Sequence, residues 1–161
     1  MHSLFFKQPN DCVDSLNKNV EDGWTVFNEH LYHISIERIE NFKLAQNYCE
    51  NLNASMVSIH SQDENTFFRN LKDGEGYSDL WLNGQQEEIY SEKFKWNDES
   101  EFTYNNWHVG EPDQLQEDYI NCLGMYDGHW FDANCIRRNN PLCIRSSSDP
   151  CPDEWTFYNN Q

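Results

Sequence analysis

Six isolated cysteines constrain the fold of this 161-residue chain more than any other feature. They stand singly along the sequence, with no CxxC pair and no histidine at a spacing that would hold zinc. This pattern favours a disulfide framework over a metal cluster and predicts an oxidising, extracellular compartment. Because six cysteines allow many pairings, the sequence alone leaves the connectivity open. The cysteines are Cys12, Cys49, Cys122, Cys135, Cys143 and Cys151.

Two helices are predicted in the first half of the chain. Residues 41–53 place apolar side chains at helical spacing behind Asn41, which suits the N-cap position. Residues 61–73 open with Ser61 and Glu64 in the register of a capping box. The apolar residues that follow complete the pattern of a second amphipathic helix.

Strands dominate the second half. The sequence YINCLGMYDGHWFD at 119–132 predicts two strands joined at Asp127-Gly128, a strong signal for a two-residue hairpin turn. Residues 85–118 form a long stretch with no sustained period, and such stretches in compact domains are usually functional. Two helices followed mostly by strands predict an α+β fold. The other predicted strands are residues 55–59, 80–84 and 142–145.

We expect the chain to divide into three segments. Residues 1–20 form an N-terminal segment, 21–145 a single domain, and 146–161 a polar linker with the apparent start of a second domain. The sequence EWTFYNN at 154–160 repeats GWTVFNE at 23–29, as if a second copy were beginning. We therefore expect an excerpt of a protein with tandem domains. The alternative is a chance match over so few residues.

Acidic residues outnumber basic ones by 28 to 11, which gives a formal net charge of −17. Such a surface repels phosphate backbones and anionic membranes, so nucleic-acid binding is not expected. Clustered carboxylates suit hard cations such as Ca²⁺, although an acidic surface can equally serve solubility alone. No apolar run is long enough to span a bilayer. The sequon at Asn53 agrees with secretion and predicts a glycosylated side chain there.

Several motifs in residues 21–145 resemble the C-type lectin-like domains. They are LAQNYCENLNASMVSIHSQDENTF, LWLNG, FKWND, YNNWHVGEP and INCLGMYDGHWFDANC with PLCI. The resemblance implies an α+β fold with two helices, antiparallel strands in two small sheets and a long irregular binding loop. The region before the first helix lacks the extra cysteine pair of the family's long form, so the chain resembles the short form.

The resemblance implies two disulfides, Cys49 with Cys143 and Cys122 with Cys135. The first would tie the first helix to the last strand, and the second would staple the hairpin beside the long loop. Cys12 and Cys151 are left over just outside the two ends of the domain. We predict that they pair with each other. The competing accounts are an interchain bridge or a partner cysteine outside this chain.

A partial calcium site is implied by the same resemblance. The family's sugar-binding members draw ligands from a proline-centred triplet, an acid before the third family cysteine and a Trp-Asn-Asp triplet on the next strand. Here the triplet supplies Glu111 and Asp113, and the intervening Pro112 is a candidate for a cis peptide bond. Ile120 and Phe131 stand where an acid and an asparagine are expected, so two ligands are missing.

Asp132 completes the remaining calcium set, and Glu117 or Asp118 could replace a missing ligand if the loop is longer than usual. Ionised carboxylates only accept hydrogen bonds, so sugar hydroxyls also need a donor from elsewhere. The candidate donors are Asn105, Asn106 and His108. A second calcium position, which we do not predict to be occupied, would draw on Glu87, Ser91, Gln114 and Asn121.

Two functions follow as alternatives. The first is an extracellular carbohydrate-recognition module that binds glycans or glycoproteins through the long loop, with calcium as a possible cofactor. The second is a calcium-independent protein-interaction or receptor module on the same scaffold, because a fold does not fix a function. The missing ligands favour the second and the intact triplet favours the first. An enzyme is not predicted, because no nucleophile stands beside a base in a recognisable motif.

Overall fold

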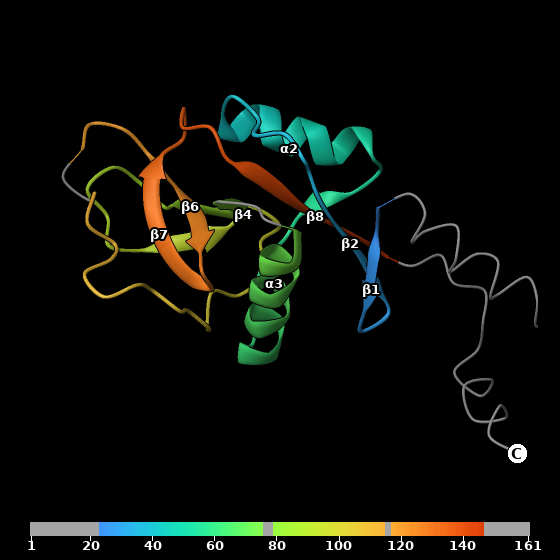
Figure 1. Ribbon diagram of the computed structural model, residues 1–161. Coiled ribbons are helices and arrows are strands. Elements are labelled where there is room, and N and C mark those ends of the chain that lie inside the picture. The colour runs from blue at the N-terminus through green and yellow to red at the C-terminus, as the bar shows by residue number, and fades with distance from the viewer. Residues whose placement is uncertain (1–22, 76–78, 115–116, 147–161) are drawn as a thin grey trace, which may run out of the picture. The chain divides into compact units, whose positions relative to one another are not determined.

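A computed structural model describes residues 23–75, 79–114 and 117–146, with the side chains of 72–75 left out (Figure 1). The chain forms two compact units, of which the larger is Ile34–Ile144. The described part of the smaller unit comprises residues 23–33 and 145–146. The N-terminal segment, the repeat at 154–160 and the predicted pairing of Cys12 with Cys151 lie outside the described residues.

The smaller unit contains a β-hairpin that the sequence patterns did not predict. Strand β1 (Thr25–Phe27) pairs antiparallel with the start of β2 (His30–Ile34), with Phe27 opposite His30. The two residues of the turn, Asn28 and Glu29, both have positive φ, at 44° and 63°. This is the backbone of a two-residue hairpin turn, in which Asn-Glu replaces the usual Asn-Gly signal.

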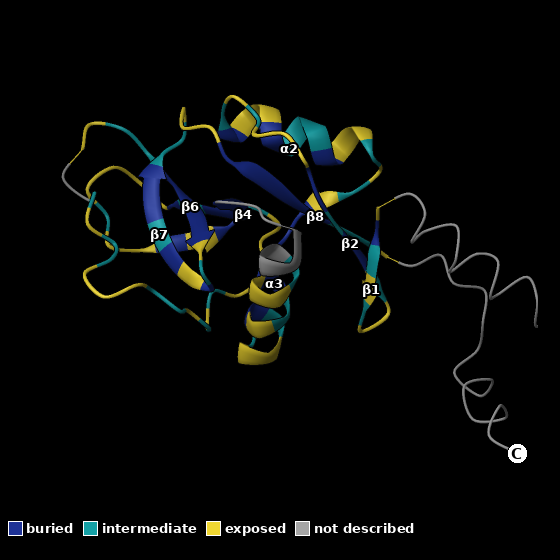
Figure 2. Cartoon of the chain, viewed as in Figure 1, coloured by how far each residue is buried: buried dark blue, intermediate teal, exposed yellow. Residues whose placement is uncertain are grey.

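Helix α2 (Phe42–Asn51) begins as predicted. The side chain of Asn41 accepts a hydrogen bond from the N–H of Leu44 at 2.9 Å, which caps the helix. The buried face carries Ala45 and Cys49, while the opposite face is exposed (Figure 2). Cys49 forms a disulfide with Cys143 in β8 (Asn140–Ser146), as the family resemblance implies.

Helix α3 (Gln62–Glu75) is hydrogen-bonded to a second hairpin, which turns at Asp127-Gly128. Ser61 accepts a hydrogen bond from the N–H of Glu64 at 3.2 Å, and Glu64 reaches back to the N–H of His60 rather than to Ser61 itself. From the first turn, buried Asn65 donates to the carbonyl of Gly128 at 2.7 Å. The helix therefore positions the hairpin turn through a side chain rather than through apolar contact alone.

The sheet of the larger unit has the order β8-β4-β6-β7 (Figure 1). Its second strand, β4, is almost wholly buried and pairs antiparallel with β6 and β5. β4 pairs with β8 in parallel, and β8 also pairs with the short strand β3. The bounds are β3 Ser55–Met56, β4 Leu80–Gln86, β5 Phe94–Trp96, β6 Asn121–Tyr126 and β7 His129–Asn134.

The α+β class is confirmed, and the sheet differs from expectation in three details. The parallel pairing of β4 with β8 joins strands that the resemblance placed in antiparallel sheets. Strand β3 ends at Met56 instead of residue 59, and the long stretch contains β5. Parallel partners lie far apart in the chain, so hydrophobic periodicity and turn signals cannot reveal them.

The core draws buried residues from α2, α3 and the sheet, which are dark blue in Figure 2, and its largest fully buried side chains are three tryptophans. Trp81, Trp96 and Trp130 are almost fully buried, and the rings of the last two meet edge to face with centroids 5.5 Å apart. The Trp130 indole N–H donates to Asn65 at 2.8 Å. Among the described residues, no helix combines the length and apolar character needed to cross a bilayer.

Candidate metal and ligand site

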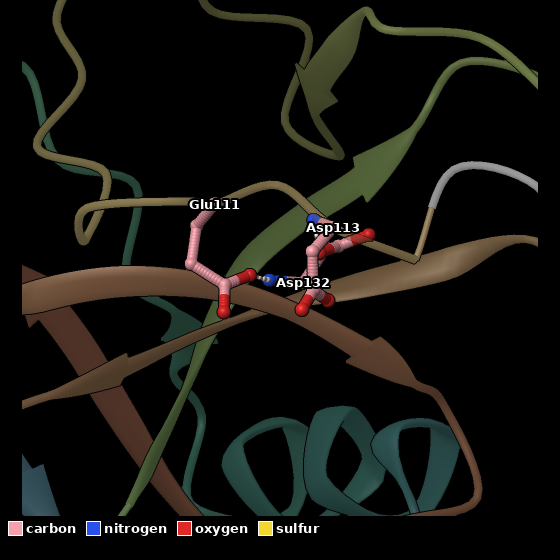
Figure 3. Close-up of side chains that lie close together, drawn as sticks. All are labelled: Glu111, Asp113 and Asp132. Carbon is pink, nitrogen blue, oxygen red and sulfur yellow. Dashed lines mark hydrogen bonds between the residues drawn. The ribbon is translucent and has the colours of Figure 1, made fainter.

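The loop that carries the proline-centred triplet is fastened to β7. The N–H of His108 donates to the carbonyl of Trp130 at 2.9 Å, and the N–H of Trp130 donates to the carbonyl of Asn106 at 2.8 Å. The peptide bond between Glu111 and Pro112 is cis, as the resemblance implies. These contacts bring the triplet over β7, the strand that contains Asp132 (Figure 3).

Three carboxylates meet at this point (Figure 3). Glu111, Asp113 and Asp132 each offer an oxygen, and these oxygens lie within 4.8 Å of one another. Asp132 is buried, Glu111 is half-buried and Asp113 is exposed. The cluster is therefore open to solvent on the loop side and closed on the strand side, which suits a site where an ion and a ligand would enter from solution.

Backbone N–H groups orient the cluster. Asp132 accepts hydrogen bonds from the N–H of Asp113 at 2.8 Å and from that of Gln114 at 3.2 Å. The N–H of Asp132 in turn donates to Glu111 at 3.4 Å, the bond drawn in Figure 3. Two of the three acids are thus held by the loop and strand that they connect, which fixes their separation before any ligand arrives.

The acids also repel one another. Burial raises the pKa of the Glu111 carboxyl above its ordinary value, hydrogen bonding with the carboxyl of Asp132 raises it further, and so do the charges of Asp113 and Asp132. The N–H of Asp132 opposes this rise. A divalent cation among the three would relieve the repulsion, so the electrostatics favour cation binding.

The donor set fits a hard cation only in part. Three carboxylates offer at most six oxygens, whereas calcium takes about six to eight ligands and usually combines carboxylates with carbonyls and water. Glu117 and Asp118 are exposed and do not belong to the cluster, and Asp118 accepts a hydrogen bond from the hydroxyl of Tyr90 instead. Glu111, Asp113 and Asp132 are the residues that would hold the ion.

Neutral amides occupy the region of the second calcium position. The side chain of Asn121 donates to the carbonyl of Gln114 at 2.7 Å, and the backbone N–H of Asn121 donates to the side-chain oxygen of Gln86 at 3.2 Å. Gln86 donates in turn to the carbonyl of Ser91 at 2.7 Å. These hydrogen bonds join β4, β6 and the long loop, and Glu87, the residue after Gln86, is exposed.

The three predicted donors differ in their surroundings. Asn105 is exposed, whereas the amide of Asn106 already donates to the carbonyl of Gly128 at 2.6 Å. His108 bonds through Nδ1 to the carbonyl of Val109 at 3.1 Å. A carbonyl only accepts, so Nδ1 carries the proton and Nε2 of the neutral ring is an acceptor. In this tautomer the uncharged His108 ring does not supply the missing donor.

A pocket of about 360 Å³ adjoins the cluster and shares Glu111 with it. Glu111 and His108 were predicted from the sequence as ligand-binding residues, whereas the other lining residues were not, although His129 and Phe131 stand two residues apart in β7 and so face the same side. The lining residues are Asp79, His108, Glu111, Tyr126, His129, Phe131 and Arg137.

A family model for the lectin C-type domain matches residues 38–145. The chain belongs to the C-type lectin family. Ladderlectin of Oncorhynchus mykiss is 31% identical to this chain over 118 residues, which cover 70% of the chain and 60% of ladderlectin. The chain thus spans less than two thirds of that relative. Its family and fold are those of binding modules.

Solved structures agree with this assignment. The mouse scavenger receptor C-type lectin carbohydrate-recognition domain has a TM-score of 0.66 and 30% identity, covering 77% of this chain and 94% of that domain. The cow CD23 carbohydrate-recognition domain, solved in the presence of an oligosaccharide, has a TM-score of 0.67 and 28% identity, covering 78% and 94%. Both likenesses extend over nearly the whole of the solved domain.

Proposed function

We propose that this chain is an extracellular carbohydrate-recognition module that binds glycans through a calcium ion held by Glu111, Asp113 and Asp132. The observation that carries the proposal is the meeting of these three carboxylates within 4.8 Å beside a cis proline. The likeness to a cow domain solved with an oligosaccharide supports the ligand class. The two disulfides, Cys49 with Cys143 and Cys122 with Cys135, both formed as the resemblance implies, support the extracellular location. Asn53 is exposed and so is available for glycosylation.

The residues of the site would have different roles in binding. When bound, calcium would supply a Lewis-acidic contact for sugar hydroxyl oxygens. Glu111 and Asp113 would accept hydrogen bonds from the same hydroxyls, because ionised carboxylates only accept. Asp132, buried and held by two N–H groups, would fix the floor of the site. Hydrogen-bond donors to the sugar must come from other side chains.

A protein-interaction function is the second candidate, and a specific observation favours it. Asp132 already accepts two N–H groups, so part of the cluster is satisfied without an ion. In addition, Val109 and Ile136 are 95% and 76% exposed, and each follows or precedes a residue that lines the pocket. Exposed apolar side chains at the rim of a site suit contact with a protein partner.

A glycan array probed with and without calcium tests the proposal. We expect binding in calcium buffer, loss in chelator, and loss in the paired variant Glu111→Gln with Asp113→Asn. The matched control is Glu117→Gln with Asp118→Asn, which removes the same charge from exposed acids outside the cluster. This control should bind as the wild type does.

The remaining outcomes separate the two candidates. Binding that persists in chelator but disappears in the paired cluster variant would mean that the loop recognises glycans without an ion. Absence of glycan binding in both buffers, together with capture of a protein ligand that chelator does not release, would establish the calcium-independent interaction module instead.

A further inference from the structure

The floor of the pocket is formed by a residue that the family resemblance marks as a missing ligand. Phe131 in β7 lies opposite Gly124 in β6. A Cβ placed at Gly124 would come within 2.4 Å of the tip of the Phe131 ring, so the ring covers the strand where a side chain would otherwise stand. Phe131 thereby presents an apolar surface on the outer side of the sheet.

The side chain of Arg137 lies over this ring and makes two contacts. The guanidinium carbon of Arg137 lies 5.1 Å from the centre of the Phe131 ring, and the guanidinium forms an ion pair with Asp79. The Arg137 side chain is 47% exposed, whereas that of Asp79 is 13% exposed. Arg137 is thus oriented before a ligand arrives and has five N–H donors, more than one carboxylate can use.

The pocket continues from the carboxylate cluster. Glu111 belongs to both, so a ligand bound at the cluster would extend into the pocket without crossing a gap. His108 and His129 line the pocket with their rings nearly perpendicular and their centroids 5.6 Å apart. The pocket therefore combines an aromatic surface, a donor and several acceptors beside the point where we place the first sugar.

This combination selects a chemical class of ligand. A sugar ring has apolar C–H faces that pack on aromatic rings and hydroxyls that both donate and accept, which matches Phe131 with Arg137 and Glu111. The charges of Arg137 and Asp79 balance, and Glu111 leaves the pocket negative, which disfavours acidic sugars. A volume of about 360 Å³ falls within the usual range for ligand pockets.

We propose that the pocket lined by Phe131, Arg137 and Asp79 is a second saccharide subsite, which holds a neutral sugar next to the one bound at the carboxylate cluster. The inference rests on the proposed function, because the first sugar must be bound for the second to be positioned. It assigns Phe131 and Arg137 to the recognition of ligands longer than one residue.

Titration calorimetry with mono- and disaccharides in calcium buffer tests the subsite. The probes are methyl α-mannoside and methyl β-galactoside, the disaccharides mannobiose and lactose, and sialyllactose as the acidic counterpart. We expect one disaccharide to bind about tenfold more tightly than its monosaccharide, as one stacked ring would give, and sialyllactose to gain nothing over lactose.

The variants are Phe131→Ala and the charge-neutral pair Asp79→Asn with Arg137→Gln, which avoids leaving the buried acid of Asp79 unpaired. Each should bring the disaccharide affinity to that of the monosaccharide while the monosaccharide affinity stays unchanged. Val109→Ala, exposed beside the pocket, is the control. Thermal unfolding of every variant shows that it is folded at the temperature of the titration.

The outcomes distinguish the subsite from the proposed function. Equal affinity of the wild type for mono- and disaccharides, tighter binding of sialyllactose, or a disaccharide preference that survives in both variants would overturn the neutral subsite and leave calcium-dependent recognition standing. If the wild type binds neither these sugars nor any glycan on the array in calcium, the proposed function and the subsite both fail.

Discussion

The N–H of Asp113 donates to the carboxylate of Asp132 at 2.8 Å, across 19 residues of sequence. The bond joins the proline loop to β7. It brings the two acids together, because the backbone N–H of Asp113 serves as a hydrogen-bond donor to the carboxylate of Asp132. Gln114 adds a second N–H to the same carboxylate. The cluster is therefore partly organised without an ion, and its fold and its affinity for a cation can be separated by mutation.

Asp132→Asn should separate these two roles. The amide oxygen of asparagine can still accept from Asp113 and Gln114, so the loop stays in place, but one negative charge is lost. We expect the calcium-dependent rise in unfolding temperature to disappear with little change in chelator. Asp132→Ala removes the acceptor as well and should cost about 1 kcal/mol more in the free energy of unfolding, measured by denaturation in chelator.

Glu111→Gln should stabilise the calcium-free protein at neutral pH. The raised pKa means that the folded state holds the Glu111 proton more tightly than the unfolded chain does. That contribution is fully present below the ordinary pKa of 4.5 and is lost as the pH rises through the raised value. In chelator the variant should therefore unfold at a higher temperature than the wild type at pH 7.

The advantage of Glu111→Gln should shrink as the pH falls through the raised pKa towards 4.5, and it should be absent below 4.5, where the wild-type carboxyl is protonated in both states. Glu117→Gln serves as the control, since this exposed acid is outside the cluster. A wild type more stable than Glu111→Gln at pH 7 in chelator would mean that repulsion among the acids is not the dominant effect.

Gly124→Ala should disturb the pocket floor. Its Cβ would meet the Phe131 ring at 2.4 to 3.0 Å, closer than carbon atoms approach, so the ring must move. We expect a loss of about 1–3 kcal/mol in the free energy of unfolding, measured by denaturant titration. Adding Phe131→Ala to Gly124→Ala removes the clash, so the double variant should be more stable than the sum of the single changes predicts. Additive losses would contradict the contact.

Asn65→Ala should weaken the link between α3 and the hairpin. The change removes the partner of the Trp130 indole N–H and one of the two amides that donate to the Gly128 carbonyl, the other being that of Asn106. Asn65, Gly128 and Trp130 are all buried. We expect a cost of about 2–4 kcal/mol in the free energy of unfolding. Asn70→Ala on the exposed side of the same helix is the control and should cost less than about 0.5 kcal/mol.

Local sequence signals predicted the helices and most of the strands, but they did not predict how all of the strands pair. The caps at Asn41 and Ser61 and the turn at Asp127-Gly128 formed as expected, because each depends on residues a few positions apart. The parallel contact of β4 with β8 joins Leu80 to Asn140, which no local pattern encodes. The family resemblance supplied the fold that these signals alone left open.

The same distinction applies to the candidate site: the motif predicted some of its residues, and the others depend on contacts between distant parts of the chain. The triplet motif placed Glu111 and Asp113 near Asp132, but the substitution of Glu117 or Asp118 for missing ligands depended on the path of a long loop, which composition does not determine. Arg137 was not predicted, because its role depends on Asp79, 58 residues earlier, and on the ring of Phe131. Its neighbours in sequence give no sign of either contact.

Thermal unfolding with millimolar calcium and with chelator tests the central claim most directly, because an ion that binds only the folded state raises the midpoint. The account predicts a higher midpoint in calcium for the wild type and for Glu117→Gln with Asp118→Asn. It predicts no shift for Glu111→Gln with Asp113→Asn. A wild-type midpoint that is the same in calcium and in chelator would contradict calcium binding by Glu111, Asp113 and Asp132.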